Sequence, residues 1–215
     1  MTNRLFNFLK VIIATLVVLS FFGSCKEKIK DAIKKGLEAG DESISETNFK
    51  RIVVDSLYAV SIPKYMKEMS NLDDQATLQY GNIYKNLYTV VIHEDKEDFI
   101  AYFNEIGAYN DSLSVVDNYA AGQVQYFKES ITNCMVIPYQ IKKIKGYDAR
   151  QFGFNGVVGG AQVAYVIAYI ETEGDLFMLM NWTQIDRFNR FEDTFKAINN
   201  SFEYLLNAKK VNEIQ

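Results

Sequence analysis

His93 is the only histidine in the chain, and Glu94, Asp95, Glu97 and Asp98 follow it closely. Imidazole and carboxylate groups together can bind a metal ion or act as a general base. A zinc site normally needs several histidine or cysteine ligands, and a general base needs a nucleophile, which no hydrolase motif supplies here. The acidic run instead predicts the start of a helix, where negative charge complements the helix dipole. We therefore expect no catalytic residue, no metal site and no cofactor.

A glycine-rich stretch, GFNGVVGG from Gly153 to Gly160, invites comparison with phosphate-binding loops. Such a loop needs glycine turns that open into the N-terminus of a helix. This stretch precedes a β-patterned run at 162–172 and matches neither common nucleotide-binding spacing. It predicts instead a β-hairpin with a bulge, whose turn we place at Asn155-Gly156 because both central residues must accept positive φ.

Two groups of side chains could contact a ligand or a partner. Trp182, with Asn181 and Thr183, ends an apolar run and could line a pocket, although packing in the core or at its rim is the favoured interpretation. Four tyrosines could form an adhesive surface, because tyrosine is enriched at interfaces, but half-buried packing is favoured for them as well. These are Tyr102, Tyr109, Tyr119 and Tyr126.

Cys25 follows an apolar run, Val11 to Phe22, and two small residues. Arg4 and Lys10 precede the run without any acid, which completes the three-part arrangement of a secretory signal. The run is too short for a spanning helix, which needs about 20 predominantly apolar residues. A thiol placed here can be alkylated with diacylglycerol and its freed amine then acylated. Cys25 is therefore the predicted lipidation site and the first residue of the mature chain.

The segment Phe22-Gly23-Ser24-Cys25 resembles the signal of bacterial lipoproteins, in which an aliphatic residue and two small residues precede the cysteine. It fits at three positions and departs at Phe22. The resemblance implies acyl chains such as palmitate on Cys25 and attachment to a membrane of the cell envelope without a spanning segment. An uncleaved anchor and an ordinary cleaved signal are the alternatives.

The composition describes a folded, acidic domain, with 14% aromatic residues and only two prolines. Removal of residues 1–24 takes away two of the 23 basic residues and none of the 27 acidic ones, which leaves a net charge of −6. This argues against nucleic acid as a partner, because a basic stripe would be needed. Cys134 then lacks an intrachain cysteine partner, so we expect a buried thiol, with an intermolecular bridge as the alternative.

These patterns predict a signal peptide at 1–24, a lipid-anchored tether at 25–47, a single domain at 48–207 and a C-terminal tail at 208–215. Two glycines weaken any helix in the tether, so we interpret it as a partly helical, mobile spacer. The alternative is that its lysines lie on anionic lipid head groups. These are Lys26, Lys28, Lys30, Lys34 and Lys35.

Hydrophobic periodicity predicts strands and helices in mixed order. Strands are predicted at 49–54, 58–62, 76–81, 87–93, 139–145, 150–154, 162–172 and 176–182, with one helical turn at 65–74. Helices are predicted behind Asp95, at 113–131, and at 188–205 behind Asp186 as cap. Hairpin connections in place of repeated crossovers favour the α+β class, with an antiparallel sheet covered by helices on its faces.

Three stretches, YAVSIPKYM, LQYGNIYKNLYTVVI and FEDTFKAINNSFEYL, carry a resemblance to a known family. Their marks are Ile62-Pro63 at the end of a strand, Leu78-Gln79-Tyr80 with Asn82, and the pair Ser201-Phe202 at the end of the last helix. Together they resemble the PsbP-like and DcrB-like superfamily, from about Phe49 to Leu205. The resemblance implies a small α+β domain of PsbP-like architecture with a non-catalytic accessory or docking role, and it brings no catalytic residue to this chain.

These observations predict a lipid-anchored protein of the bacterial cell envelope that is not an enzyme. We expect the lipid on Cys25 to hold it on a membrane while the domain presents a face to an envelope protein partner. One alternative is a small-ligand-binding lipoprotein with a pocket between sheet and helices. The other is a hydrolase that uses His93 beside Cys134 or a serine.

Overall fold

The structure, a computed structural model, describes residues 44–205 of the 215. Cys25, the signal peptide at 1–24, most of the tether and the tail at 208–215 lie outside the described residues. Between residues 44 and 205, none of the helices combines the length and the apolar character that a bilayer crossing requires.

The described chain alternates strands and helices. The strands are β1 (Phe49–Val54), β2 (Tyr58–Pro63), β3 (Lys67–Glu68), β4 (Ala76–Asn82), β5 (Leu87–Asp95), β6 (Thr132–Tyr139), β7 (Lys143–Ile144), β8 (Tyr147–Val158), β9 (Ala161–Glu171), β10 (Asp175–Gln184) and β11 (Glu203–Tyr204). The α-helices are α3 (Lys96–Glu105), α4 (Val115–Ser130) and α5 (Phe188–Asn200), and the 3-10 turns are η2 (Glu46–Asn48) and η3 (Ile185–Arg187).

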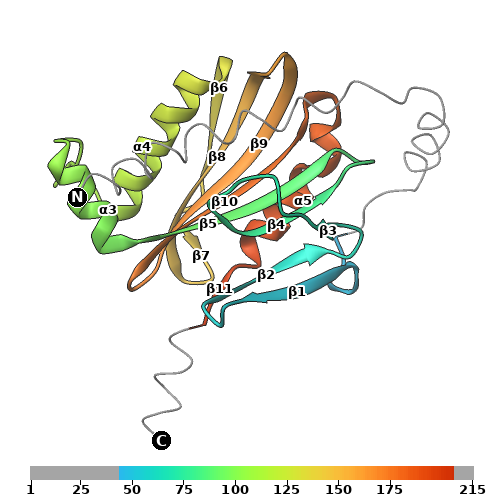
Figure 1. The fold of residues 1–215 in the computed structure, drawn as a ribbon, viewed down its shortest axis with the longest axis horizontal. Coiled ribbons are helices and arrows are strands. Elements are labelled where there is room, and N and C mark those ends of the chain that lie inside the picture. Colours follow the sequence, from blue (N-terminus) through green and yellow to red (C-terminus); the bar gives the residue numbers. More distant parts are fainter. Residues whose placement is uncertain (1–43, 206–215) are drawn as a thin grey trace, which may run out of the picture.

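The strands form two antiparallel sheets. The large sheet has eight strands in the order β3-β4-β5-β10-β9-β8-β6, with β7 paired to β8, and the small sheet has the order β1-β2-β11. Helices α3 and α4 cover one face of the large sheet, and α5 and the small sheet cover the other (Figure 1). The predicted α+β class, an antiparallel sheet with helices on its faces, is confirmed.

Strand β9 shows why the large sheet needs cover on both sides. Tyr165, Ile167 and Tyr169 belong to the core under α4, whereas Val166 and Ala168 alternate with them and belong to the core under α5. Successive side chains of a strand point to opposite faces, so a run that is apolar at every position has to be buried on both. The strand predicted at 162–172 is confirmed, and it lies between β10 and β8 inside the large sheet.

A chain of buried amides fastens α5 to the large sheet. Asn181 of β10 accepts a hydrogen bond from Thr89 Oγ1 of β5 at 2.8 Å and donates to Asn199 Oδ1 of α5 at 2.8 Å. Asn181 also donates to the Val166 carbonyl of β9 at 3.2 Å, and Asn199 donates to Gln151 Oε1 of β8 at 3.1 Å. Four strands and one helix are thus joined by polar contacts inside an apolar layer.

The turn predicted at Asn155-Gly156 is wrong, because both residues lie inside β8. The chain reverses instead at Gly159 and Gly160, whose φ values of 56° and 84° suit glycine. Gly156 is required for a steric reason. A Cβ at this position would lie 2.2 Å from Cγ2 of Ile131, at the end of α4. The glycine therefore allows a close approach of helix and sheet and makes no turn.

Other predicted boundaries also differ from the structure. Segment 65–74 has no helical turn; Lys67 and Glu68 pair with β4 as the short strand β3. Helix α5 begins at Phe188 without a side-chain cap from Asp186, which lies in η3. It ends at Asn200, and the chain then extends so that β11 can pair with β2.

Candidate functional site

Polar side chains gather where the central strands end. Leu176, at the start of β10, lies opposite both Glu94 of β5 and Glu171 of β9, so the ends of these three strands coincide. Because side chains alternate between faces, His93 and Asp175 lie on the α5 side, and Glu94 and Glu171 lie on the α4 side. We call these four residues the polar end.

On the α5 side, three strands meet through one carboxylate. His93 Nε2 donates to Asp175 Oδ1 at 2.6 Å, and Tyr204 Oη of β11 donates to Asp175 Oδ2 at 2.5 Å. The His93 ring stacks on Phe177, with 5.1 Å between ring centroids. Burial and the Asp175 carboxylate raise the pKa of Tyr204 well above its usual range, so its hydroxyl remains a donor. The contacts tie the small sheet to the large one.

An imidazole held by a carboxylate could serve as a general base if a nucleophile stood beside its second nitrogen. The structure does not bring Cys134 there. Cys134 adjoins Met135, which pairs with Asn155 of β8, whereas His93 aligns across β10 and β9 with Ala149, six residues earlier in β8. At ~3.3 Å per residue along a strand, the two side chains are separated by more than about 20 Å. Cys134 is half-buried, and burial raises the pKa of its thiol.

On the α4 side, Glu94 enters the core. Its Oε1 accepts a hydrogen bond from Tyr119 Oη at 3.0 Å, and Tyr119 is fully buried against the ring of Tyr169. Among residues 44–205, neither Glu94 Oε2 nor Tyr169 Oη has a hydrogen-bond partner. Burial raises the pKa of Glu94. Because the folded domain binds this proton more tightly than the unfolded chain, the stability that Glu94 contributes decreases as pH rises through its folded pKa.

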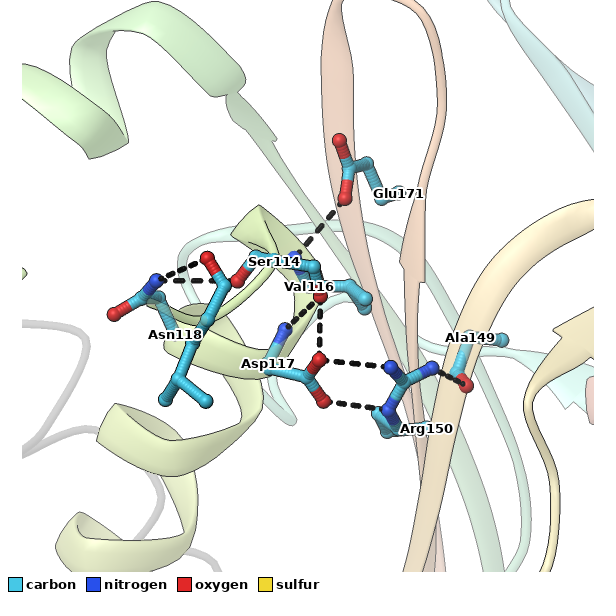
Figure 2. A network of polar contacts seen from close by, with 8 residues as sticks. Ser114, Val116, Asp117, Asn118, Ala149, Arg150 and Glu171 are labelled. Carbon is cyan, nitrogen blue, oxygen red and sulfur yellow. Dashed lines mark hydrogen bonds and ion pairs between the residues drawn. The ribbon is translucent and has the colours of Figure 1, made fainter. Parts of the chain in front are cut away.

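One ion pair and one hydrogen bond hold the start of α4 against the sheet (Figure 2). Arg150 of β8 donates two hydrogen bonds to the Asp117 carboxylate, from Nε at 2.6 Å and from Nη2 at 2.8 Å. This guanidinium lowers the pKa of Asp117. Glu171 accepts from the Val116 amide at 3.0 Å and lies 3.3 Å from Lys96 Nζ, at the start of α3. Both helices are therefore positioned by the ends of β8 and β9.

The acidic run after His93 does begin a helix. Asp95 is the N-cap of α3 and accepts a hydrogen bond from the amide of Asp98 at 2.9 Å, as predicted. Glu97 and Asp98 lie in the first turn, where their charge complements the dipole. Alternation along β5 sends His93 and Glu94 to opposite faces of the sheet, so the five side chains do not converge.

The remaining predicted candidates are packing residues. Trp182 is half-buried and stacks on Tyr88, with 5.3 Å between centroids, and its neighbour Asn181 belongs to the buried amide chain. Tyr119 is completely buried, and the other three tyrosines of that group are half-buried. The favoured interpretation of core or rim packing is confirmed for these side chains.

The polar end connects elements that are distant in sequence. Sequence reasoning singled out His93 but missed its partners Asp175 and Tyr204, as well as the pair of Arg150 and Asp117. The pattern Ser114-x-x-Asp117 at the start of α4 was the one local signal for Asp117. Ser114 is the N-cap of this helix, and its Oγ accepts a hydrogen bond from the Asp117 amide at 3.2 Å. The long-range partners required the strand register.

Comparisons with known proteins concern the fold. No protein-family model and no curated protein matches the sequence. Solved structures with a similar course of the chain include CyanoP, the cyanobacterial PsbP of Synechocystis sp. PCC 6803, with 10% identity over 79% of this chain and 99% of that chain, at a TM-score of 0.49.

Two others are LpqN of Mycobacterium tuberculosis, described as involved in cell envelope biogenesis, and the Ran-binding protein Mog1p of Saccharomyces cerevisiae. LpqN has 11% identity over 77% of this chain and 98% of that chain, at a TM-score of 0.44. Mog1p has 8% identity over 75% and 97%, at a TM-score of 0.48. These similarities concern the backbone fold alone.

Proposed function

We propose that this chain is a lipid-anchored, non-catalytic protein of the bacterial cell envelope, whose α+β domain presents a face to an envelope partner. The observation that carries the proposal is the N-terminal pattern, in which the apolar run from Val11 to Phe22 leads through two small residues to Cys25. Acyl chains on that residue would hold the domain at a bilayer, because each buried CH₂ contributes about 0.8 kcal/mol.

The geometry of the polar end supports a role without catalysis. His93 Nε2 donates a hydrogen bond to Asp175 Oδ1, and Tyr204 Oη donates one to Asp175 Oδ2. These bonds join β5, β10 and β11 into one unit. His93 lies at the opposite end of the sheet from Cys134. Its hydrogen bond and its position therefore favour a structural role for this histidine.

Cys25→Ala is expected to abolish labelling of the protein by an alkyne fatty-acid analogue in cells. The reason is that the thiol and the amine of this residue are the proposed acylation sites. Gel fluorescence after coupling to a dye measures the labelling. Cys134→Ala is the matched control and should retain the full signal, because Cys134 is a half-buried residue of the domain. Labelling that persists in Cys25→Ala would contradict the lipid anchor.

His93→Gln is expected to leave the cellular phenotype of the protein unchanged and to cost about 1 kcal/mol of stability. Glutamine can still donate a hydrogen bond toward Asp175 but cannot act as a base near neutral pH. Complementation of a deletion strain measures function, and circular dichroism confirms the fold. A variant that folds normally and fails to complement would show that the imidazole does chemistry, and the non-catalytic assignment would fall.

A further inference from the structure

The turn between β4 and β5 projects two large apolar side chains into solvent. Ile83 is 59% exposed and Tyr84 is 58% exposed. The turn itself is well fixed, because Asn82 Oδ1 accepts from the amides of Tyr84 and Lys85 at 3.1 and 3.0 Å. Asn82 Nδ2 also donates to the Tyr65 carbonyl at 2.9 Å. Because Ile83 and Tyr84 point into solvent, they add little buried apolar area to the core of the domain. They are therefore available for contact with another molecule or with a membrane.

Basic side chains surround this turn. Lys85 Nζ lies 4.5 Å from the centre of the Tyr65 ring, and Arg187 Nη1 donates to the Tyr84 carbonyl at 3.1 Å. Arg190 lies beside Phe191 at the start of α5, and Lys67 pairs with Gly81 next to the turn. Lys64 precedes Tyr65, the residue whose carbonyl accepts from Asn82 of the turn. With Ile83 and Tyr84 these residues form the turn patch, whose basic members are Lys64, Lys67, Lys85, Arg187 and Arg190.

The charge of the turn patch contrasts with the rest of the chain. The segments that carry its five basic residues also hold the acids Glu68, Asp186, Glu192 and Asp193. Of these, Glu192 and Asp193 lie 2.9 and 3.6 Å from Lys196 Nζ, and the whole chain has a net charge of −4. A local excess of positive charge around exposed Ile and Tyr side chains matches an anionic bilayer surface. There, aromatic rings settle among the head groups and basic residues pair with phosphates.

The position of the turn patch relative to the tether points to the same partner. The amide of Lys64 donates to the Asn48 carbonyl at 2.9 Å, and Phe49 pairs with Pro63. The chain therefore enters the domain beside the patch, on the side of the molecule where the β4–β5 turn lies (Figure 1). A tether of 23 residues, 25–47, would make a second contact with the same bilayer intramolecular and so raise its effective concentration.

We propose that the turn patch lies on the anionic surface of the membrane that holds the lipid anchor, with Ile83 and Tyr84 among the head groups. This inference rests on the proposed function, since the anchor brings the patch to the bilayer. It fixes the orientation of the domain: the β4–β5 turn faces the membrane and the β6 edge of the large sheet faces away.

Tryptophan fluorescence of the full-length, acylated protein tests this orientation. Tyr84→Trp is made in a Trp182→Phe background, so that the chain holds one tryptophan, and the protein is reconstituted into vesicles of phosphatidylcholine with or without phosphatidylglycerol. We expect a blue shift and quenching by brominated lipid when phosphatidylglycerol is present. Met135→Trp in the same background is the matched control, because Met135 is 60% exposed on β6, and it should show neither effect.

Charge reversal provides a second measurement. Lys64→Glu combined with Lys67→Glu should weaken the quenching, by about five-fold in partitioning for each lysine removed. Lys142→Glu combined with Lys143→Glu makes the same change of charge at β7 and should leave it intact. High salt should weaken the contact as well, because it screens exposed charges.

The failures can be told apart. A protein that floats with the vesicles but shows the same spectrum for Tyr84→Trp and Met135→Trp would overturn the membrane contact and leave the lipid anchor standing. A protein that does not float contradicts the anchor, and the orientation with it. A blue shift that needs added envelope protein instead of anionic lipid would assign the turn patch to a protein partner and overturn the proposal.

Discussion

Phe177→Ala is expected to lower the free energy of unfolding by about 4 kcal/mol, the largest loss from one residue that we anticipate. Phe177 is fully buried and contacts the rings of Tyr58, His93 and Phe202, with centroids 5.2, 5.1 and 4.9 Å away. Its removal opens a cavity at the point where the large sheet, the small sheet and the chain after α5 meet. Urea unfolding followed by circular dichroism measures the change.

Phe177→Leu is the control for this prediction, because it keeps an apolar side chain and should cost about 1.5 kcal/mol. We expect Phe177→Ala also to expose β11 to proteolysis before the rest of the domain, since Tyr204 then loses the ring of Phe177 and retains that of Tyr147. A loss below about 1 kcal/mol for the alanine variant would show that the junction collapses around the cavity and is less rigidly packed than described.

Asn181→Leu is expected to cost about 3 kcal/mol, although leucine has nearly the same size and is apolar. The substitution leaves no cavity. It removes a hydrogen-bond partner from Thr89 Oγ1, Asn199 Oδ1 and the Val166 carbonyl, all of which belong to buried residues. Buried polar groups that lose their partner retain the full cost of desolvation. Thermal or urea unfolding measures the loss.

Asn189→Leu serves as the matched control, since Asn189 is an exposed residue of α5 and surface substitutions usually change stability by less than about 0.5 kcal/mol. If Asn181→Leu were as stable as the parent protein, the amide chain would contribute no net stability. Its role would then be to select one orientation of α5 on the sheet, which hydrogen exchange of α5 would detect.

The elements that the sequence predicted well are those that local patterns determine. The doubly apolar run of β9 can only be a central strand, and Asp95 can cap α3 because its partner amide is three residues away. The strand β6 was missed because Pro138 suggested a boundary. An edge strand tolerates proline, since its outward amide has no strand to bond, and β6 is such an edge.

The partners in the polar end were beyond local reasoning for a physical reason. Asp175 is 82 residues from His93, and Tyr204 is another 29 residues away. The periodicity within β5 or β10 does not specify which of their residues pair. The register of the two strands determines the pairing, and the packing of both cores sets this register. The Asn155-Gly156 turn failed in the same way, because Gly156 is explained by Ile131 of a distant helix.

The small sheet has a consequence for how the chain matures. Its third strand, β11, pairs Glu203 with Ala59, a residue 144 positions earlier, so the sheet remains incomplete until nearly the whole domain has left the ribosome. Contacts of such long range form late and slowly. In the export that we propose, a small sheet that cannot close before residue 204 has been made would leave the chain incompletely folded during synthesis, which is the condition that passage through a translocation channel requires.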